Sequence, residues 1–163
     1  MFYKIDNYLK ALYRFSGYIA AIFLILVAIF ILTGIASRIF DFYIRGLAEY
    51  SGYCMAASSF LALAYTFGEK GHIRITLFLE RSGKNIRRFL DLWCFLVATF
   101  FSGFLSFYFI KMLVISIKFQ ERSEGADEIL IWIPQVAVAL GSTIFFICVL
   151  HNFILLILKK NSN

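Results

Sequence analysis

The sequence predicts an all-α integral membrane protein with four transmembrane helices, an interfacial amphipathic helix, and both termini in the cytoplasm. The main observation is a set of four stretches without any Asp, Glu, Lys or Arg: Phe15–Ser37, Tyr50–Phe67, Leu92–Ile110 and Ile129–Leu158. Each is close to the roughly 20 residues that a helix needs to cross a hydrocarbon core of roughly 30 Å. A helix also satisfies its own backbone hydrogen bonds, which the bilayer interior requires because it holds no water.

The composition supports the same fold class. Of the 163 residues, 61% are hydrophobic, whereas soluble domains average about 45–50%. Four spans use most of the length, so residues 1–163 are expected to form a single membrane domain. The net charge of +6 comes from Lys and Arg beside the apolar stretches, where anionic head groups attract them. No nucleic-acid-binding motif accompanies this charge, so the expected partners include membrane lipids and exclude nucleic acid.

The first two spans are predicted at about residues 15–37 and 48–67. The first apolar stretch follows a basic start but exceeds the 7–15 residues of a signal-peptide core, so it is interpreted as a retained helix. The connection between the spans, Arg38–Glu49, mixes charged residues with aromatic ones. Aromatic residues at such positions typically anchor helix ends at the membrane interface.

A cytoplasmic amphipathic segment is predicted at about residues 72–90, followed by a third span at about 90–112. Ile86, Phe89, Leu90 and Trp93 recur at helical spacing, which indicates an amphipathic helix that runs into this span. Alternating residues before it leave the local secondary structure open. We expect the segment to brace the membrane surface, through His72, Arg74, Arg81, Lys84, Arg87, Arg88 and Trp93. The alternative is a plain basic loop.

The fourth span is predicted at about residues 134–158, because Pro134 suits the first turn of a helix. Residues 129–133 would then lead into it along the interface. Eleven Lys and Arg residues lie in the termini and middle loop, against five in the other two loops. The positive-inside rule therefore places both termini in the cytoplasm. The acidic cluster of the last outer loop faces the other compartment, and its members are Glu121, Glu124, Asp127 and Glu128.

Chemistry within the bilayer requires an ionisable group at depth, and the spans offer no such group at mid-depth apart from histidine. We therefore expect neither catalytic residues nor a metal site. His72 and His151 leave open an alternative function, a haem-binding membrane anchor of a respiratory enzyme. Small residues four positions apart predict close helix packing, at Gly52 and Ala56, Ser58 and Ala62, Ser102 and Ser106, and Ala137 and Gly141. These pairs serve either the packing of the four helices or the docking of a second protein, and we favour docking for at least one of them.

Over nearly its whole length the chain resembles the small membrane subunit, the DctQ type, of tripartite ATP-independent periplasmic (TRAP) transporters. The resemblance rests on Ser37-Arg38 with Phe40, Glu49, the run Ala56–Ala64, the turn Gly68–Ile75, and Pro134. It implies a non-enzymatic scaffold subunit in the bacterial inner membrane. Its partners would be a large multi-span subunit that binds sodium and moves the substrate, and a periplasmic binding protein. The substrate would be an organic acid, such as sialic acid, a dicarboxylate or a related anion.

Three groups of residues are assigned to these partners as expectations. Arg38 and Glu49 form a polar lock, either with each other or with the large subunit, unless they are unrelated interfacial charges. Gly52, Ala56 and Ala62 form the partner interface. Glu121, Glu124, Asp127 and Glu128 are the candidate contact with the binding protein, and the alternative is a solvated turn. No cofactor is expected apart from phospholipids.

Overall fold

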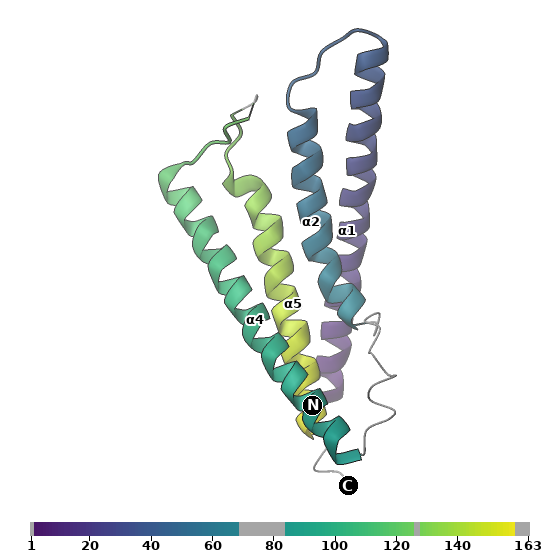
Figure 1. Ribbon diagram of the computed structural model, residues 1–163, viewed down its shortest axis with the longest axis vertical. Coiled ribbons are helices and arrows are strands. Elements are labelled where there is room, and N and C mark those ends of the chain that lie inside the picture. The colour runs from purple at the N-terminus through teal and green to yellow at the C-terminus, as the bar shows by residue number, and fades with distance from the viewer. Residues whose placement is uncertain (1, 69–83, 126–127, 159–163) are drawn as a thin grey trace.

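The computed structural model describes residues 2–68, 84–125 and 128–158. These form four helices, which keep the labels of Figure 1: α1 (Phe2–Ile39), α2 (Leu47–Gly68), α4 (Lys84–Phe119) and α5 (Trp132–Leu158). Three of them contain segments long and apolar enough to cross a membrane, at Asn7–Ile39, Phe89–Phe119 and Trp132–Ile157. The predicted all-helical membrane fold is confirmed to that extent.

Helix α2 does not belong to those three because it is less apolar. It carries glycine and hydroxyl-bearing residues along its length, among them Ser51, Gly52, Ser58, Ser59 and Thr66. That α2 also spans the membrane therefore stays a prediction. The location of each span within its helix also stays a prediction, because α1 and α4 extend well beyond the predicted limits of their spans.

The helices stand side by side in the order α1, α2, α5, α4 (Figure 1). Helix α1 packs along α2, α2 along α5, and α5 along α4, whereas α1 touches α5 only slightly. The expected four-helix bundle is therefore an open row, since its two edge helices do not close on each other. Consequently few described side chains are fully buried, and both broad faces of the row are exposed.

Close approach of α5 to α2 depends on Gly141. A Cβ atom there would lie 2.7 Å from the carbonyl carbon of Phe60 and 2.8 Å from the nitrogen of Leu61. Backbone atoms cannot move aside as the end of a side chain can, so only glycine fits. Small residues let helices approach closely in lipid, and this member of the predicted pairs serves packing within the chain.

Hydroxyl groups join the outer pairs of the row. Ser16 Oγ of α1 donates to the Leu61 carbonyl of α2 at 2.6 Å, and Ser106 Oγ of α4 lies 3.0 Å from Thr143 Oγ1 of α5. Ser102, one turn away from Ser106, is also buried. The predicted small-residue face of α4 is thus used inside the chain, where such bonds contribute about 0.6 kcal/mol each on average.

The sequence predicted two local features of the helices correctly. Pro134 lies in the first turn of α5, where its missing N–H costs nothing. The amphipathic stripe from Ile86 to Trp93 is helical, but these residues are the first turns of α4, continuous with the rest of that helix. The part of the predicted surface segment before Lys84 lies outside the described residues.

Candidate functional site at the loop end

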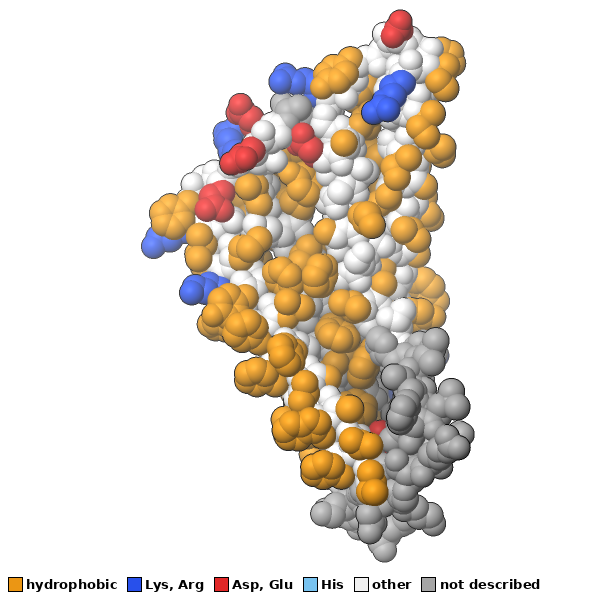
Figure 2. All heavy atoms as spheres, viewed as in Figure 1, with side chains coloured by type: hydrophobic (Ala, Val, Ile, Leu, Met, Phe, Trp, Pro, Cys, Tyr) orange, Lys and Arg blue, Asp and Glu red, His pale blue; other side chains and the backbone are white. Residues whose placement is uncertain are grey.

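We call the end of the molecule that carries the α1–α2 and α4–α5 connections the loop end; it comprises residues 38–49 and 120–131. Figure 2 shows charged side chains gathered there and hydrophobic side chains below them on the displayed face. A polar rim above an apolar belt is the distribution expected at a membrane interface. The loop end is therefore the described region with the most potential for specific contacts.

Helix α1 ends in a left-handed cap. The Phe40 N–H donates to the Ala36 carbonyl and the Phe42 N–H to the Ser37 carbonyl, both at 3.0 Å. Asp41 supplies the left-handed residue between them, with φ of 57°. Asp tolerates this conformation better than most residues, and the bond from Phe42 matches the longer bond of a Schellman motif.

Helix α2 begins just after Gly46, whose φ is 74°, and it carries Glu49 in its first turn. A carboxylate at this position is favourable because it faces the positive end of the helix dipole. The side chain of Glu49 packs directly against Gly125 of the α4–α5 connection, so that a Cβ atom at Gly125 would overlap the carboxylate. Glu49 thereby links the two halves of the row.

A hydrogen bond lies beside this contact. Tyr53 Oη of α2 is 2.8 Å from Ser123 Oγ, and Ser123 Oγ also accepts the Gly125 N–H at 3.2 Å. We call these four residues, Glu49, Tyr53, Ser123 and Gly125, the α2 latch. It fastens the α4–α5 connection to the start of α2, although 70 positions separate Tyr53 from Ser123.

The remainder of the α4–α5 connection is held by its own bonds. Ser116 Oγ donates to Glu121 Oε2 at 2.7 Å, and the Glu121 N–H donates to the Ser116 carbonyl at 3.2 Å. An antiparallel bridge then pairs Arg122 with Leu130. Glu121, Glu124 and Glu128 are all exposed, and Glu121 also takes part in the local structure through its bonds with Ser116. Asp127 lies outside the described residues.

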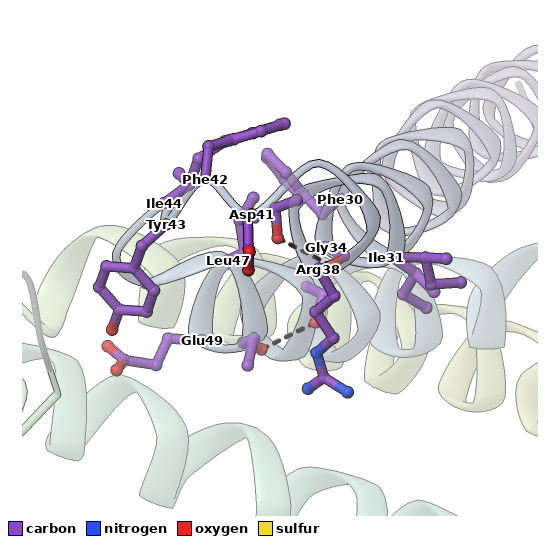
Figure 3. A pocket seen from close by; sticks show the side chains of 15 residues that line it. Phe30, Ile31, Gly34, Arg38, Asp41, Phe42, Tyr43, Ile44, Leu47 and Glu49 are labelled. Atoms are coloured by element: carbon purple, nitrogen blue, oxygen red, sulfur yellow. Dashed lines mark hydrogen bonds between the residues drawn. The ribbon is translucent and has the colours of Figure 1, made fainter.

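No ion pair joins Arg38 to Glu49, both of which the structure describes. Their charged groups point away from each other, as Figure 3 shows, and Arg38 is exposed. The predicted pair with Arg38 is not formed because the Glu49 carboxylate packs against Gly125 and is turned towards the α4–α5 connection. A lock between Arg38 and a second protein stays a prediction.

The predicted membrane brace cannot be placed in full. His72, Arg74 and Arg81 lie outside the described residues. Lys84, Arg87 and Arg88 belong to the first two turns of α4, and Trp93 on the next turn is 57% exposed. Both the brace and the plain basic loop therefore stay open as interpretations.

The predicted partner interface lies on an exposed stripe of α2. Its exposed members recur at helical spacing, at Ala48, Gly52, Met55, Ser59 and Thr66. A Cβ atom added to Gly52 would meet nothing within 4 Å, and Ala56 and Ala62 are half-buried beside the stripe. Of the predicted small residues, Gly52 is therefore left free for a neighbour, while Gly141, Ser102 and Ser106 are used inside the chain.

Sequence reasoning missed Tyr53, Ser123 and Gly125. A glycine in a polar turn is ordinary, and nothing in the sequence relates it to a helix that begins far upstream. The only available signal was Glu49 itself, an acidic residue at the start of an apolar stretch. Its partner depends on how the two halves of the row meet.

Replacing Gly125 with alanine is expected to destabilise the protein by about 1 kcal/mol, the lower end of the usual cost of overpacking, because the new methyl group displaces the Glu49 carboxylate, which is the flexible end of a side chain. Thermal unfolding of the purified protein in detergent measures the loss. When Glu49 is already alanine, there is no carboxylate to displace. Gly125→Ala should therefore cost much less stability in the Glu49→Ala background than in the unchanged protein. Equal costs in the two backgrounds would contradict the contact.

The described residues offer no group of three or more His, Cys, Asp or Glu side chains that could hold a metal ion. A row of four described helices, three of which carry segments long and apolar enough to cross a bilayer, is the architecture of a helical membrane protein. The family model of tripartite ATP-independent periplasmic transporters, DctQ component, matches residues 26–159. The chain therefore belongs to the DctQ family.

This match confirms the family that the sequence motifs indicated. The family is a component of transporters, which agrees with a role other than catalysis and gives no support to the haem-binding alternative. Searches of curated proteins and of solved structures found no match to the chain.

Proposed function

We propose that the chain is the non-catalytic scaffold subunit of a sodium-coupled TRAP transporter in the bacterial inner membrane. It braces the large subunit, which binds sodium and carries an organic acid that a periplasmic binding protein delivers. The match to the DctQ component over residues 26–159 is the observation that carries this proposal. The open row of helices supports it, because two broad exposed faces suit a frame that holds a neighbour.

In this function α2 is the fourth span. Its 22 residues reach about 33 Å at the helical rise of 1.5 Å per residue, enough to cross the hydrocarbon core. The helix lies between α1 and α5, both of which carry apolar segments of sufficient length. Because it is covered by protein on two sides, α2 needs less apolar surface than the edge helices α1 and α4. The charge bias then puts the loop end in the periplasm.

The large subunit is proposed to dock on the exposed stripe of α2. Helix α4 exposes large aromatic side chains at Phe100, Phe101, Phe104 and Phe107, as expected where a helix faces lipid tails. The α2 stripe instead exposes small and hydroxyl-bearing side chains around Gly52 and Ser59, with Met55 as its one large member. Such residues favour helix–helix contact in a bilayer, because backbones can approach and hydroxyl groups can bond across the interface.

The α4–α5 connection is proposed to face the binding protein. Glu124 and Glu128 are exposed at the loop end, and the α2 latch fixes the base of their loop to α2. The basic residues before and within the start of α4 then lie at the cytoplasmic surface, where anionic lipids attract them.

Reconstitution tests the function. The large subunit of the same transporter would be placed in liposomes with and without this chain, together with the binding protein and an inward sodium gradient. Sialic acid and succinate serve as labelled probes. We expect uptake of one of them only when all three proteins and the gradient are present. Uptake by this chain alone, or equal uptake without it, would contradict the scaffold function.

A further inference from the structure

A pocket of about 650 Å³ opens at the loop end between the last turns of α1 and the start of α2. Its size falls within the range of small-molecule sites, about 300–1,000 Å³. Phe30, Ile31 and Ile35 form an apolar wall on α1, and Arg38 and Asp41 lie at the end of the same helix (Figure 3). The pocket thus has one apolar half and one charged half.

The charge pattern of α1 leads us to expect the boundary between hydrocarbon and head groups within this pocket. Its apolar wall belongs to the uncharged stretch that ends at Ser37, and Arg38 is the first charged residue after that stretch. Gly34 lines the wall between them, and a Cβ atom there would meet nothing within 4 Å. The missing side chain leaves room beside α1 at the depth where a lipid tail joins its head group.

The charged residues that line the pocket are one cation, Arg38, and two anions, Asp41 and Glu49. The Glu49 carboxylate is turned towards Gly125 of the α4–α5 connection, which leaves Arg38 and Asp41 for a ligand. The exposed Arg38 makes no ion pair with any residue that the structure describes, and Asp41 is exposed in the left-handed cap three residues later. A guanidinium group binds phosphate through two parallel N–H donors. The Asp41 carboxylate and the partly negative carbonyl end of α1 favour an ammonium group, which supplies three N–H donors.

We propose that this pocket binds one phospholipid whose head group carries both a phosphate and a primary amine. The phosphate contacts Arg38, the ammonium group contacts Asp41 at the cap of α1, and one acyl chain lies along Phe30, Ile31 and Gly34. The lipid fills the gap between α1 and the α1–α2 connection. This assignment does not depend on the identity of the transported substrate.

Native mass spectrometry of the purified chain in detergent tests the proposal. Phosphatidylethanolamine, phosphatidylcholine and phosphatidylglycerol with identical acyl chains are added in turn. We expect the first to bind most tightly, because methylation removes the amine donors of the second and the third has no amine. Arg38→Gln should weaken all three by about tenfold or more, because each loses its charge-assisted hydrogen bonds to the phosphate. Asp41→Asn should weaken phosphatidylethanolamine most, phosphatidylcholine less because it keeps the positive charge without N–H donors, and phosphatidylglycerol not at all.

Two matched controls distinguish the pocket from the general surface. Gly34→Leu fills the apolar half and should abolish specific binding, whereas Ala28→Leu places a leucine on exposed α1 surface that does not line the pocket. Arg45→Gln removes a charge from the same connection but not from the pocket lining. Equal binding by Arg38→Gln and Arg45→Gln, or no preference among the three lipids, would overturn the proposal. So would loss of the lipid when the large subunit is bound, because a protein segment would then occupy the pocket.

Discussion

Replacing Gly141 with leucine is expected to lower the free energy of unfolding by about 3 kcal/mol, at the upper end of the usual cost of overpacking. The Cβ atom alone would come within 2.8 Å of backbone atoms of Phe60 and Leu61, and a leucine adds three further carbon atoms. Either α5 moves away from α2 or the side chain is strained. The midpoint of thermal unfolding, followed by circular dichroism in detergent, and the fraction of monodisperse protein measure the effect.

Gly52→Leu is the matched control for this prediction. Gly52 also lies in a helix, but its Cβ position is open. Leucine there gains up to about 1 kcal/mol of helix propensity over glycine, so stability should stay equal or rise slightly. If Gly141→Leu unfolded at the same temperature as Gly52→Leu, the close crossing of α2 and α5 would be refuted.

The sequence was sufficient for the features that depend on local physical chemistry. Charge-free stretches predict α1, α4 and α5 because the cost of placing a charge in hydrocarbon acts on each residue separately. Pro134 indicates the first turn of α5, which begins two residues earlier at Trp132, for the same kind of reason, its own missing N–H. A charge-free stretch predicts α2 in the same way, but its glycine and serine residues make it less apolar, so its crossing of the membrane stays a prediction.

The arrangement of the helices and the contacts of the loop end could not be predicted in this way. Tyr53 and Ser123 are 70 positions apart, and their contact exists only because α2 and α5 cross where Gly141 allows them to approach. The four small-residue pairs share one spacing, so the sequence could not distinguish Gly141, which faces α2, from Gly52, which faces outward. Whether a small residue packs inside the chain or faces outward depends on which neighbour lies beside it. The sequence alone does not identify that neighbour.

Gly52→Leu is further expected to reduce recovery of the large subunit with this chain by about tenfold or more, equivalent to at least about 1.4 kcal/mol of binding. The reason is the proposed docking stripe, on which a leucine would hold the two backbones apart. The measurement is the yield of large subunit after affinity purification of the tagged chain from co-expressing cells. Because the variant is expected to fold normally, a loss of recovery reports on the interface rather than on stability.

Ala28→Leu on α1 is the control for this second expectation, since Ala28 is also exposed and also small. It should retain the large subunit, because the apolar surface around it is proposed to face lipid tails, which accommodate added bulk. The opposite result, with Ala28→Leu losing the large subunit and Gly52→Leu keeping it, would move the docking face from α2 to α1. Loss in both variants would mean that the neighbour covers this side of the row from α1 to α2, and the α2 stripe would no longer be sufficient to define the interface.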